Sequence, residues 1–561
     1  MVDYINNADI LVLIAYFTLV FWIAYIVTAR SKKEKAGDYN SSDYFLGGRN
    51  QGWLVIGASL FASNIGSEHL VGLAGSGARG DMPAAQFELL ASLILLVLGW
   101  FFVPLYLKSG VFTMPEFLEK RYNKSARNYL SVVSILAYIL TKISITIFAG
   151  ALVFEVLGVS FWTGALLVVL ATGIYTVMGG LKAVLYTDML QMFVLLIGAI
   201  GVTFVGLEAI GGTSELIKIL SESSPENGPI RHLDLWRSLS DPEFPWTGIL
   251  LGAPILGVWY WCTDQFIVQR VLSARNVSTA RKGTIFAGFL KTLPLFLFVI
   301  PGVIAYALHS KGMLEAMNNP DQALPAMISH LLPHGMKGLV LAGLLAALMS
   351  SLSSVFNSCS TLFTIDIYKR IKKNASEKEL VLTGQMVTLI LVVISLLWIP
   401  FMRSIMEGGG LYKYLQSIQA YISPPIAAVF LFGLFFRELN GKGAIAALWI
   451  GFVLGAGRLV LEFLSVEGVI NSGSNYLMDA FITSNFLHFA IFLFVICTLV
   501  LFSVSYMNKE VIRPEVEALL FRRGVFSSVG SMRTDVVLTI ALIALILLIW
   551  FVFSPFGISV R

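Results

Sequence analysis

The sequence predicts an all-α polytopic membrane protein with 14 transmembrane helices, and three observations lead to this prediction. Of the 561 residues, 57% are hydrophobic and only 13% are charged, whereas a soluble domain has about 25% charged residues. The mean hydropathy is +0.80. Apolar runs of about 20 residues, the length that crosses a bilayer, recur along the whole chain. Basic residues gather in alternate connecting segments, as they do in membrane proteins.

The apolar runs give the predicted spans in chain order. Several runs exceed the minimum length, which allows a tilted or partly broken helix. The predicted spans cover residues 8–29, 52–76, 85–107, 128–157, 160–178, 183–207, 247–268, 283–307, 337–367, 379–402, 411–436, 441–463, 484–506 and 536–554.

The charges around the first span predict the topology. Asp3 and Asp9 precede or begin this span and basic residues follow it from Arg30, which is the reverse of a signal peptide. We therefore expect an uncleaved helix, both chain termini outside, and a plasma membrane location of the bacterial inner-membrane type. The positive-inside rule then places four basic groups in internal loops, while the external loop at 465–483 has no Lys or Arg. The four groups are Lys108, Lys120, Arg121, Lys124 and Arg127; Arg270, Arg275, Arg281 and Lys282; Lys369, Arg370, Lys372 and Lys373; and Lys509, Arg513, Arg522 and Arg523.

Several function classes are excluded or disfavoured by what the sequence lacks. It has no phosphate-binding loop, no dinucleotide fingerprint and no metal-type cysteine spacing. The net charge of +5 follows from the loop asymmetry and gives no reason to expect nucleic acid as a partner. The remaining classes are a secondary transporter, a channel, a sensor and an intramembrane enzyme, and no cofactor is expected.

Two predicted spans contain helix-breaking residues. The second span, within FASNIGSEHLVG, is interrupted at Asn64-Ile65-Gly66, and the seventh at Gly252-Ala253-Pro254, followed by Gly257. Secondary transporters often consist of inverted repeats whose first helices are broken near the membrane midplane. An offset of five spans gives the two helices opposite orientations, which favours inverted five-helix repeats. The alternative is that these residues only permit close helix packing.

The ninth span carries a hydroxyl cluster, MSSLSSVFNSCST from Met349 to Thr361. A lone Ser or Thr in a membrane helix usually bonds back to its own helix. A cluster could instead supply several hard oxygen ligands to a sodium ion without adding charge. We expect such a site between this span and the broken second span.

Ionisable side chains at membrane depth are candidates for function because each is costly to insert. Those that we single out are Glu68, His69, Glu88 and Lys291. Structural alternatives remain for each: Lys291 could form an ion pair with a carboxylate, Glu88 could lie at the interface, and His69 could be a hydrogen-bonded core residue. Together they predict a polar chamber in the membrane.

Neutral polar and aromatic residues extend this chamber. Gln416 lies near the start of the eleventh span, and Tyr260 and Trp261 follow the second predicted break. Carboxylate, amide, imidazole and ammonium groups can bind sugar hydroxyls in fixed directions, and aromatic faces can stack on a sugar ring. A sugar is thus a natural ligand, while an amino acid or a polyol stays open.

From about residue 40 to 465 the sequence resembles the sodium/solute symporter family, and in particular its sodium/glucose cotransporters. The segments that carry the resemblance are DYFLGGR at 43–49, GASLFASNIGS at 57–67, TMPEFLEKRY at 113–122, GGLKAVLYTDMLQ at 179–191, WYWCTDQFIVQR at 259–270, LMSSLSSVFNSCSTLFTIDIY at 348–368 and YISPPIAAVFLFG at 421–433.

The resemblance implies a leucine-transporter-type fold with two inverted five-helix repeats. The expected divisions are residues 1–50 for an extra N-terminal helix and loop, 51–209 for the first repeat, 210–245 for an external loop, 246–440 for the second repeat and 441–561 for three additional helices. It also implies a sodium-driven symporter that imports a neutral monosaccharide of the glucose or galactose type.

The same resemblance implies roles for individual residues. The main sodium site would use backbone carbonyls of Ala62, Ile65 and Ala347 and hydroxyls of Ser350 and Ser351. A second sodium site, which only some members have, would use Ser63, Asp188 and Ser354, and the resemblance leaves open whether one or two ions are coupled. Sugar contacts would come from Asn64, His69, Glu88, Lys291 and Gln416, with Tyr260 as an inner aromatic gate and Tyr412 as an outer one.

The sequence departs from the family pattern at Gly257, Glu68 and Lys413, which leaves the sugar open among glucose, galactose, another neutral hexose and a cyclitol. Three rival functions stay open: a symporter for inositol, an organic acid or an amino acid; a sensor or sodium-leak channel; and an intramembrane enzyme. Competition assays and tests of accumulation against a gradient would distinguish them. The sequence carries no signal for the oligomeric state or for the role of the last three helices.

Overall fold

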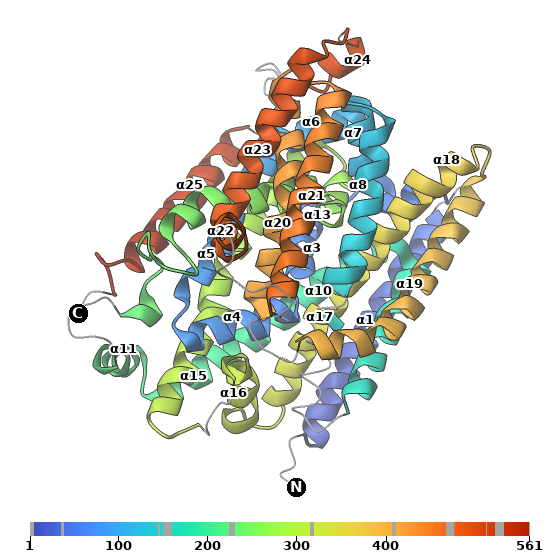
Figure 1. The fold of residues 1–561 in the computed structure, drawn as a ribbon. Coiled ribbons are helices and arrows are strands. Elements are labelled where there is room, and N and C mark those ends of the chain that lie inside the picture. The colour runs from blue at the N-terminus through green and yellow to red at the C-terminus, as the bar shows by residue number, and fades with distance from the viewer. Residues whose placement is uncertain are drawn as a thin grey trace.

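A computed structural model of the chain is a bundle of helices (Figure 1). It describes residues 5–34, 39–143, 146, 147, 150, 160–223, 230–314, 319–406, 411–466, 476–511, 513–521 and 532–559. Within these ranges the only β-type pairing is an isolated bridge between Gln51 and Ala274. The described residues contain ten helices long and apolar enough to cross a bilayer, or eleven if one bent pair is counted as a span.

The first half of the chain, including the predicted external loop, contains the following elements. They are α1 (Asn7–Glu34), α2 (Ser41–Leu46), η1 (Gly47–Arg49), α3 (Trp53–Asn64), α4 (Ser67–Arg79), η2 (Met82–Ala85), α5 (Gln86–Val97), η3 (Leu98–Phe102), α6 (Val103–Ser109), α7 (Met114–Arg121), α8 (Lys124–Ala137), η4 (Tyr138–Ile143), α10 (Phe161–Ile210), α11 (Thr213–Glu222) and η5 (Arg231–Leu233).

The second half continues the bundle. Its elements are η6 (Gly248–Gly252), α12 (Ala253–Gly257), η7 (Val258–Thr263), α13 (Gln265–Leu272), α14 (Val277–Leu290), η8 (Leu295–Val299), α15 (Ile300–Ser310), η9 (Pro320–Gln322), α16 (Ala323–Leu331), α17 (Met336–Thr361), η10 (Leu362–Tyr368), α18 (Lys369–Ile371), α19 (Glu377–Met406), α20 (Leu411–Phe435), α21 (Gly441–Val466), α22 (Tyr476–Thr483), α23 (Phe486–Met507), α24 (Pro514–Glu517) and α25 (Met532–Val552).

The predicted count of fourteen spans is not established by the described residues, for three reasons. The predicted spans 160–178 and 183–207 form one 50-residue element, α10, with a non-helical Gly180 inside it. The predicted span 247–268 contains only a short apolar helix, Gly248–Thr263. The predicted span 128–157 ends in residues outside the described ranges. Gly180 has a φ of +55°, and a Cβ there would lie 2.5 Å from the carbonyl oxygen of Tyr44, so the break requires glycine.

The break predicted in the second span is confirmed. α3 ends at Asn64, Ile65 is extended, and α4 begins at Ser67, so that the two helices meet at an angle of 60°. The backbone N–H of Gly66 donates to His69 Nδ1 instead of continuing the helix. The carbonyl groups at the end of α3 therefore lack the intrahelical donors that a continuous helix would supply.

The break predicted at Gly252-Ala253-Pro254 is wrong, since the second break lies twelve residues from Gly252, at Asp264. Gly252, Ala253 and Gly257 all have helical dihedral angles, and π-helical turns on both sides of α12 accommodate Pro254. Asp264 is extended, with ψ of 127°, and caps α13 by accepting from the N–H of Phe266. The packing alternative applies to Gly252, because a Cβ there would lie 2.5 Å from the carbonyl oxygen of Leu487 in α23.

The hydroxyl-rich helix α17 is the central element of the bundle. Every residue from 340 to 361 in α17 is buried, and the helix packs along α10 and against α1, α3 and α19. Asp9 of α1 is fully buried and accepts from the N–H groups of Gly335 and Gly338 at 2.7 Å, which caps the start of α17. The start of α1 and the end of α25 lie toward the same end of the bundle, away from α18 and α24 (Figure 1).

Two arginines assigned to an internal loop from the sequence lie elsewhere. Arg270 and Arg281 both have fully buried side chains, in α13 and α14. Arg281 Nη1 lies 3.6 Å from Asp535 Oδ2 of α25. The loop assignment failed because a basic residue between two apolar runs was read as solvated, whereas each of these arginines has a buried carboxylate partner.

Candidate substrate and sodium sites

A cavity lies beside the two breaks, between the ends of α3 and α4 on one side and α12 to α13 on the other. Its lining includes six of the predicted solute residues and two of the predicted sodium residues. They are Asn64, His69, Glu88, Tyr260, Trp261 and Gln416, and Ser63 and Ser351.

Lys291 does not line the cavity but lies directly behind its polar wall. Its ammonium group is fully buried and donates hydrogen bonds to Glu88 Oε2 and Asn64 Oδ1. Its Nζ also lies 5.4 Å from the centre of the Trp261 ring. The structural alternative for Lys291, an ion pair with a carboxylate, is therefore what the structure contains, and this pair holds two cavity side chains in place.

Glu88 and His69 continue this wall. His69 Nδ1 accepts from the Gly66 N–H, which leaves Nε2 to donate, and Nε2 lies 3.4 Å from Glu88 Oε1. Both side chains are almost fully buried, so Glu88 is not an interfacial residue. The series Lys291, Glu88, His69 thus links the C-terminal cap of α14 to α5 and α4 through one carboxylate.

Asn64 connects this wall to the aromatic side of the cavity. Its amide Nδ2 donates to the Tyr260 hydroxyl at 2.9 Å, while its Oδ1 accepts from Lys291. Because Tyr260 lies in η7 and Asn64 ends α3, this hydrogen bond joins the two broken segments across the cavity. Tyr260 is in edge contact with Trp261 and Phe266, so the aromatic groups form a continuous surface.

The structure also places the Lys142 ammonium group at the cavity, and the sequence analysis did not single out this residue. Lys142 in η4 lines the cavity and places its Nζ 3.0 Å from Asp264 Oδ2 and 4.3 Å from the centre of the Tyr260 ring. The hydroxyl of Tyr138 donates to the other oxygen of Asp264. Lys142 falls in the middle of the predicted span 128–157, so the rule that singled out Lys291 could have found it.

The other two predicted solute residues are Gln416 and Tyr412, and they are described here with the positions that depart from the family pattern. Gln416 on α20 is buried and lines the cavity with Gln419, while Gly257 lines it from α12. A Cβ on Gly257 would lie 3.0 Å from Ile94 Cγ1, so α12 packs closely against α5 at this position. The side chains of Tyr412, Lys413 and Glu68 lie outside the described residues.

The predicted main sodium residues lie at the end of α3 and on the facing side of α17. Ser351 Oγ donates to the Ser63 carbonyl at 3.0 Å, and Ser350 Oγ donates to Asp188 Oδ1 at 2.6 Å. A hydroxyl that donates its proton keeps lone pairs for a cation. Ala62, Ile65 and Ala347, whose carbonyls complete the prediction, are all buried.

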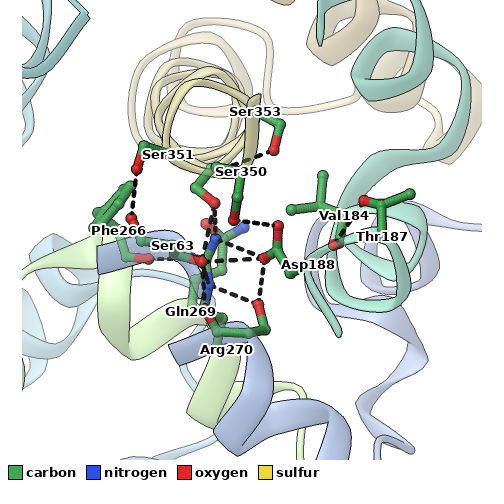
Figure 2. A network of polar contacts seen from close by, with 12 residues as sticks. Ser63, Val184, Thr187, Asp188, Phe266, Gln269, Arg270, Ser350, Ser351 and Ser353 are labelled. Carbon is green, nitrogen blue, oxygen red and sulfur yellow. Dashed lines mark hydrogen bonds and ion pairs between the residues drawn. The ribbon is translucent and has the colours of Figure 1, made fainter. Parts of the chain in front are cut away.

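The predicted second sodium residues also come together, but around a protein cation. Ser63, Asp188 and Ser354 belong to α3, α10 and α17. Figure 2 shows the Arg270 side chain beside Ser63 and Asp188. Arg270 Nε donates to Ser63 Oγ at 2.6 Å, and Nη2 donates to Ser354 Oγ and lies 3.6 Å from Asp188 Oδ2. The sequence reading missed Arg270 as a site residue because it ended the seventh span at residue 268.

The fold is shared with two solved sodium- or cation-coupled carriers of the leucine-transporter type. A substrate-bound, outward-open Na⁺-coupled sialic acid symporter superposes with a TM-score of 0.73 at 22% identity, over 90% of this chain and 98% of that one. Mhp1, a nucleobase-cation-symport-1 family transporter, superposes with a TM-score of 0.52 at 14% identity, over 86% of this chain and 99% of that one.

Curated relatives are similar at the sequence level over most of the chain. Mouse sodium/glucose cotransporter 1 is 40% identical over 534 residues, which cover 90% of this chain and 79% of the relative. Human sodium/myo-inositol cotransporter is 40% identical over 493 residues, covering 82% and 68%. The model of the sodium:solute symporter family matches residues 44–451. The chain is thus an integral membrane transporter and belongs to the sodium:solute symporter family.

Proposed function

We propose that this symporter uses the sodium gradient to import a neutral monosaccharide of the glucose or galactose type by alternating access. The observation that carries the proposal is the internal charge balance of the cavity. Glu88 is paired with Lys291, and Asp264 is paired with Lys142. A charged solute would lack a free counter-charge among these four groups, whereas a neutral polyol can use donor and acceptor positions on Glu88 and Lys142, which line the cavity.

The side chains around the cavity suit the two surfaces of a sugar ring. Glu88, Asn64, His69 and Gln416 offer donors and acceptors for hydroxyl groups in several directions. Tyr260 and Trp261 offer apolar ring faces on the side of the second break. Lys142 adds an ammonium donor beside Tyr260. In this proposal Lys291 acts through Glu88 and Asn64, which it positions.

Sodium coupling would operate through the broken helix α3–α4. Sodium bound by the carbonyls of Ala62, Ile65 and Ala347 and the hydroxyls of Ser350 and Ser351 would stabilise this break. The same break fixes Asn64 and His69, so ion binding would organise the solute side chains. A ligand shifts a conformational equilibrium only by its difference in affinity between two states. Sodium must therefore favour the outward-open state.

The energy available from one ion is sufficient for strong accumulation. One charge crossing about 100 mV supplies about 2.3 kcal/mol, and a tenfold sodium gradient supplies about 1.4 kcal/mol more. Together these would support accumulation of a neutral solute of roughly 500-fold.

Myo-inositol is a second candidate, since the relative that carries it in its name is as similar to this chain as the glucose cotransporter, at 40% identity. It is also a neutral six-membered ring with hydroxyl groups, so the charge argument does not separate the two.

For the topology, we propose that both chain ends face outward and that the end of the bundle with α18 and α24 faces the cytoplasm of a bacterial-type inner membrane.

The test compares uncharged and charged ligands of nearly equal shape. Purified protein in nanodiscs with saturating sodium is titrated with glucose, galactose, myo-inositol, glucuronate and glucosamine while binding is measured by calorimetry. The proposal expects glucose or galactose to bind with at least tenfold higher affinity than the two charged analogues, and expects Gln416→Ala to weaken that binding. Equal or tighter binding of glucuronate or glucosamine would contradict it, and tighter myo-inositol binding would select the cyclitol.

A further inference from the structure

The last helix, α25, packs against the two segments that carry the buried ion pair of the polar wall. It lies at the edge of the bundle, and most of its apolar residues are not buried (Figure 1). Its main contacts with other described helices are with α14 and α5. Glu88 belongs to α5, and Lys291 directly follows α14. The contacts of α25 therefore bear on the distance between these two charged groups.

At its C-terminal end, α25 holds the first turn of α5. Trp550 Nε1 donates to Gln86 Oε1 at 2.6 Å, and Gln86 Nε2 donates to the Leu235 carbonyl at 3.3 Å. Gln86 is fully buried and lies two residues before Glu88. The N–H of Leu235 in turn donates to the Phe553 carbonyl, directly after α25. Both ends of the Gln86 amide are thus bonded, which fixes the start of α5 relative to α25.

In its middle, α25 packs apolar side chains against both segments. Leu542 and Ile546 are buried together with Leu96 of α5 and Ile285 of α14. Gly288 lies in the last turn of α14, and a Cβ on it would lie 2.6 Å from Leu542 Cδ2. Leu542 therefore packs directly on the α14 backbone, close to the end of the helix that Lys291 follows.

Two polar contacts lie near the N-terminal end of α25. Asp535 and Arg281 of α14 are both fully buried, with 3.6 Å between Oδ2 and Nη1. Thr539 Oγ1 accepts a hydrogen bond at 3.1 Å from Nε1 of Trp100, which lies in η3 directly after α5. The Arg281 guanidinium also lies 4.1 Å from the centre of the Trp100 ring. The helix α25 thus contacts the α5–η3 segment near both of its ends and α14 at two levels.

The membrane makes these contacts difficult to exchange for others. A polar side chain that loses its partner in a bilayer finds no water to replace it. The Trp550–Gln86 and Arg281–Asp535 contacts therefore fix the position of α25 along both segments. A buried ion pair is favourable only when its two groups are well aligned, so Glu88 and Lys291 need α5 and α14 at a fixed separation.

We propose that α25 is a brace that holds α5 and α14 at the separation at which Glu88 pairs with Lys291. Gln86 and Trp550 are positioning residues for this pair. The inference gives the last helix a role at the proposed solute site, and it rests on the proposed function only for its effect on solute binding. The alignment of the pair itself is measured without any solute.

The test measures the coupling between Glu88 and Lys291 with and without the contact to Gln86. Melting temperatures in nanodiscs are compared for Glu88→Gln, Lys291→Met and the double variant, and the coupling is the departure from additivity. The same cycle is repeated in Trp550→Phe, which keeps an aromatic ring and removes the hydrogen-bond donor. The inference expects the coupling to fall by about half or more in the Trp550→Phe background.

A second measurement follows the wall from the solute side. Glucose and glucosamine are titrated by calorimetry at saturating sodium. Trp550→Phe should weaken glucose binding about fivefold, and it should reduce the preference for glucose over glucosamine because Glu88 is less well paired. Gln86→Met removes the same hydrogen bond from the other partner. The double variant Gln86→Met/Trp550→Phe should bind glucose no more weakly than the weaker of the two single variants.

The matched control is Trp449→Phe on α21, a helix that packs against α20 and α23. It should leave both the coupling and the glucose affinity unchanged. If Trp550→Phe does not fold, Gln86→Met takes its place in the cycle. Undiminished coupling in these backgrounds, or no coupling in the unaltered protein, would overturn the inference. A coupling that falls as expected in a protein that binds no sugar would instead overturn the proposed function and support the brace.

Discussion

Lys291, the residue that follows α14, donates hydrogen bonds both to Glu88 of α5 and to Asn64 at the end of α3, and its ammonium group is fully buried. A buried ion pair that is broken on one side leaves an uncompensated charge, which costs about 3–5 kcal/mol. The pair therefore fixes two solute-facing side chains and also makes each partner dependent on the other.

The first prediction concerns this dependence. Lys291→Met and Glu88→Gln should each lower the free energy of unfolding by about 3–5 kcal/mol, because each leaves one buried charge unpaired. The double variant should recover most of this loss yet fail to bind the solute, since both polar partners of the wall are gone. Thermal unfolding and solute calorimetry measure the two effects. A double variant as unstable as the sum of the single ones would show that the two residues are not coupled.

Variants of Tyr260 distinguish the contribution of its hydroxyl group to solute affinity from that of its aromatic ring. Tyr260→Phe removes the acceptor of Asn64 Nδ2 and keeps the ring, so we expect solute affinity to fall about 5- to 10-fold, near the usual value of about 1 kcal/mol for one hydrogen bond. Tyr260→Ala should weaken binding further. Tyr129→Phe, which removes a hydroxyl bonded to the Leu448 carbonyl away from the cavity, is the control. Equal affinity of Tyr260→Phe and the unaltered protein would refute a role for this hydroxyl.

The environment of the His232 ring leads us to expect that the stability of the protein depends on pH. His232 lies outside the membrane spans, stacked on Tyr306 at 4.0 Å, and its Nε2 has no hydrogen-bond partner among the described residues. Burial, followed by the nearby charges of Arg237 and Arg231, lowers the pKa of His232 to about 4, while a backbone hydrogen bond at Ala78 acts in the opposite direction. Folding thus favours the neutral ring, and the resulting stability is full above pH 6.5 and is lost as the pH falls toward 4.

The loss should be on the order of 2–3 kcal/mol between pH 7.5 and pH 4. His232→Phe keeps the stacking and cannot take a proton, so its melting temperature should fall less than that of the unaltered protein over this interval. The exposed His330, changed to Gln, is the control and should leave the pH dependence intact. A His232→Phe variant with the full acid-induced loss would assign that loss to other groups.

Gly302 lies where α15 packs closely against α4, the second half of the broken helix. A Cβ on Gly302 of α15 would lie 1.8 Å from the carbonyl oxygen of Ala74 in α4. Gly302→Ala should therefore force the two helices apart and lower the free energy of unfolding by about 1–3 kcal/mol. Gly457→Ala, in α21 with no atom within 4 Å of the new Cβ, should be neutral or slightly stabilising. Similar melting temperatures for both variants would contradict the close approach.

The sequence predicted the first break but misplaced the second, for a physical reason. Asn64 and Gly66 interrupt an otherwise apolar run, and the helix does end there. Gly252 and Pro254 are residue types that usually break helices, yet π-helical turns accommodate the proline within the helix. The helix ends instead at Asp264, which caps the next helix. Capping aspartates and π-helical turns depend on neighbouring helices, which a single sequence does not display.

The sequence predicted which residues belong to the candidate site better than it predicted how they are arranged. Residue type and depth singled out Glu88, Lys291 and His69, but not that Lys291 would lie behind the wall instead of on it. Charge position also misled the assignment of Arg270, because a loop arginine and a buried one look alike when the partner, Asp188, is 82 residues away. Which buried charges pair is decided by helix packing, and that information enters only with the structure.

The most direct measurement is the accumulation of labelled glucose and galactose in proteoliposomes that hold the unaltered protein under an inward sodium gradient. The account predicts uptake above the external concentration that collapses when a sodium ionophore dissipates the gradient, and no such accumulation with potassium in place of sodium. Uptake that only equilibrates the sugar, or that is the same with potassium, would contradict sodium-driven symport of a monosaccharide.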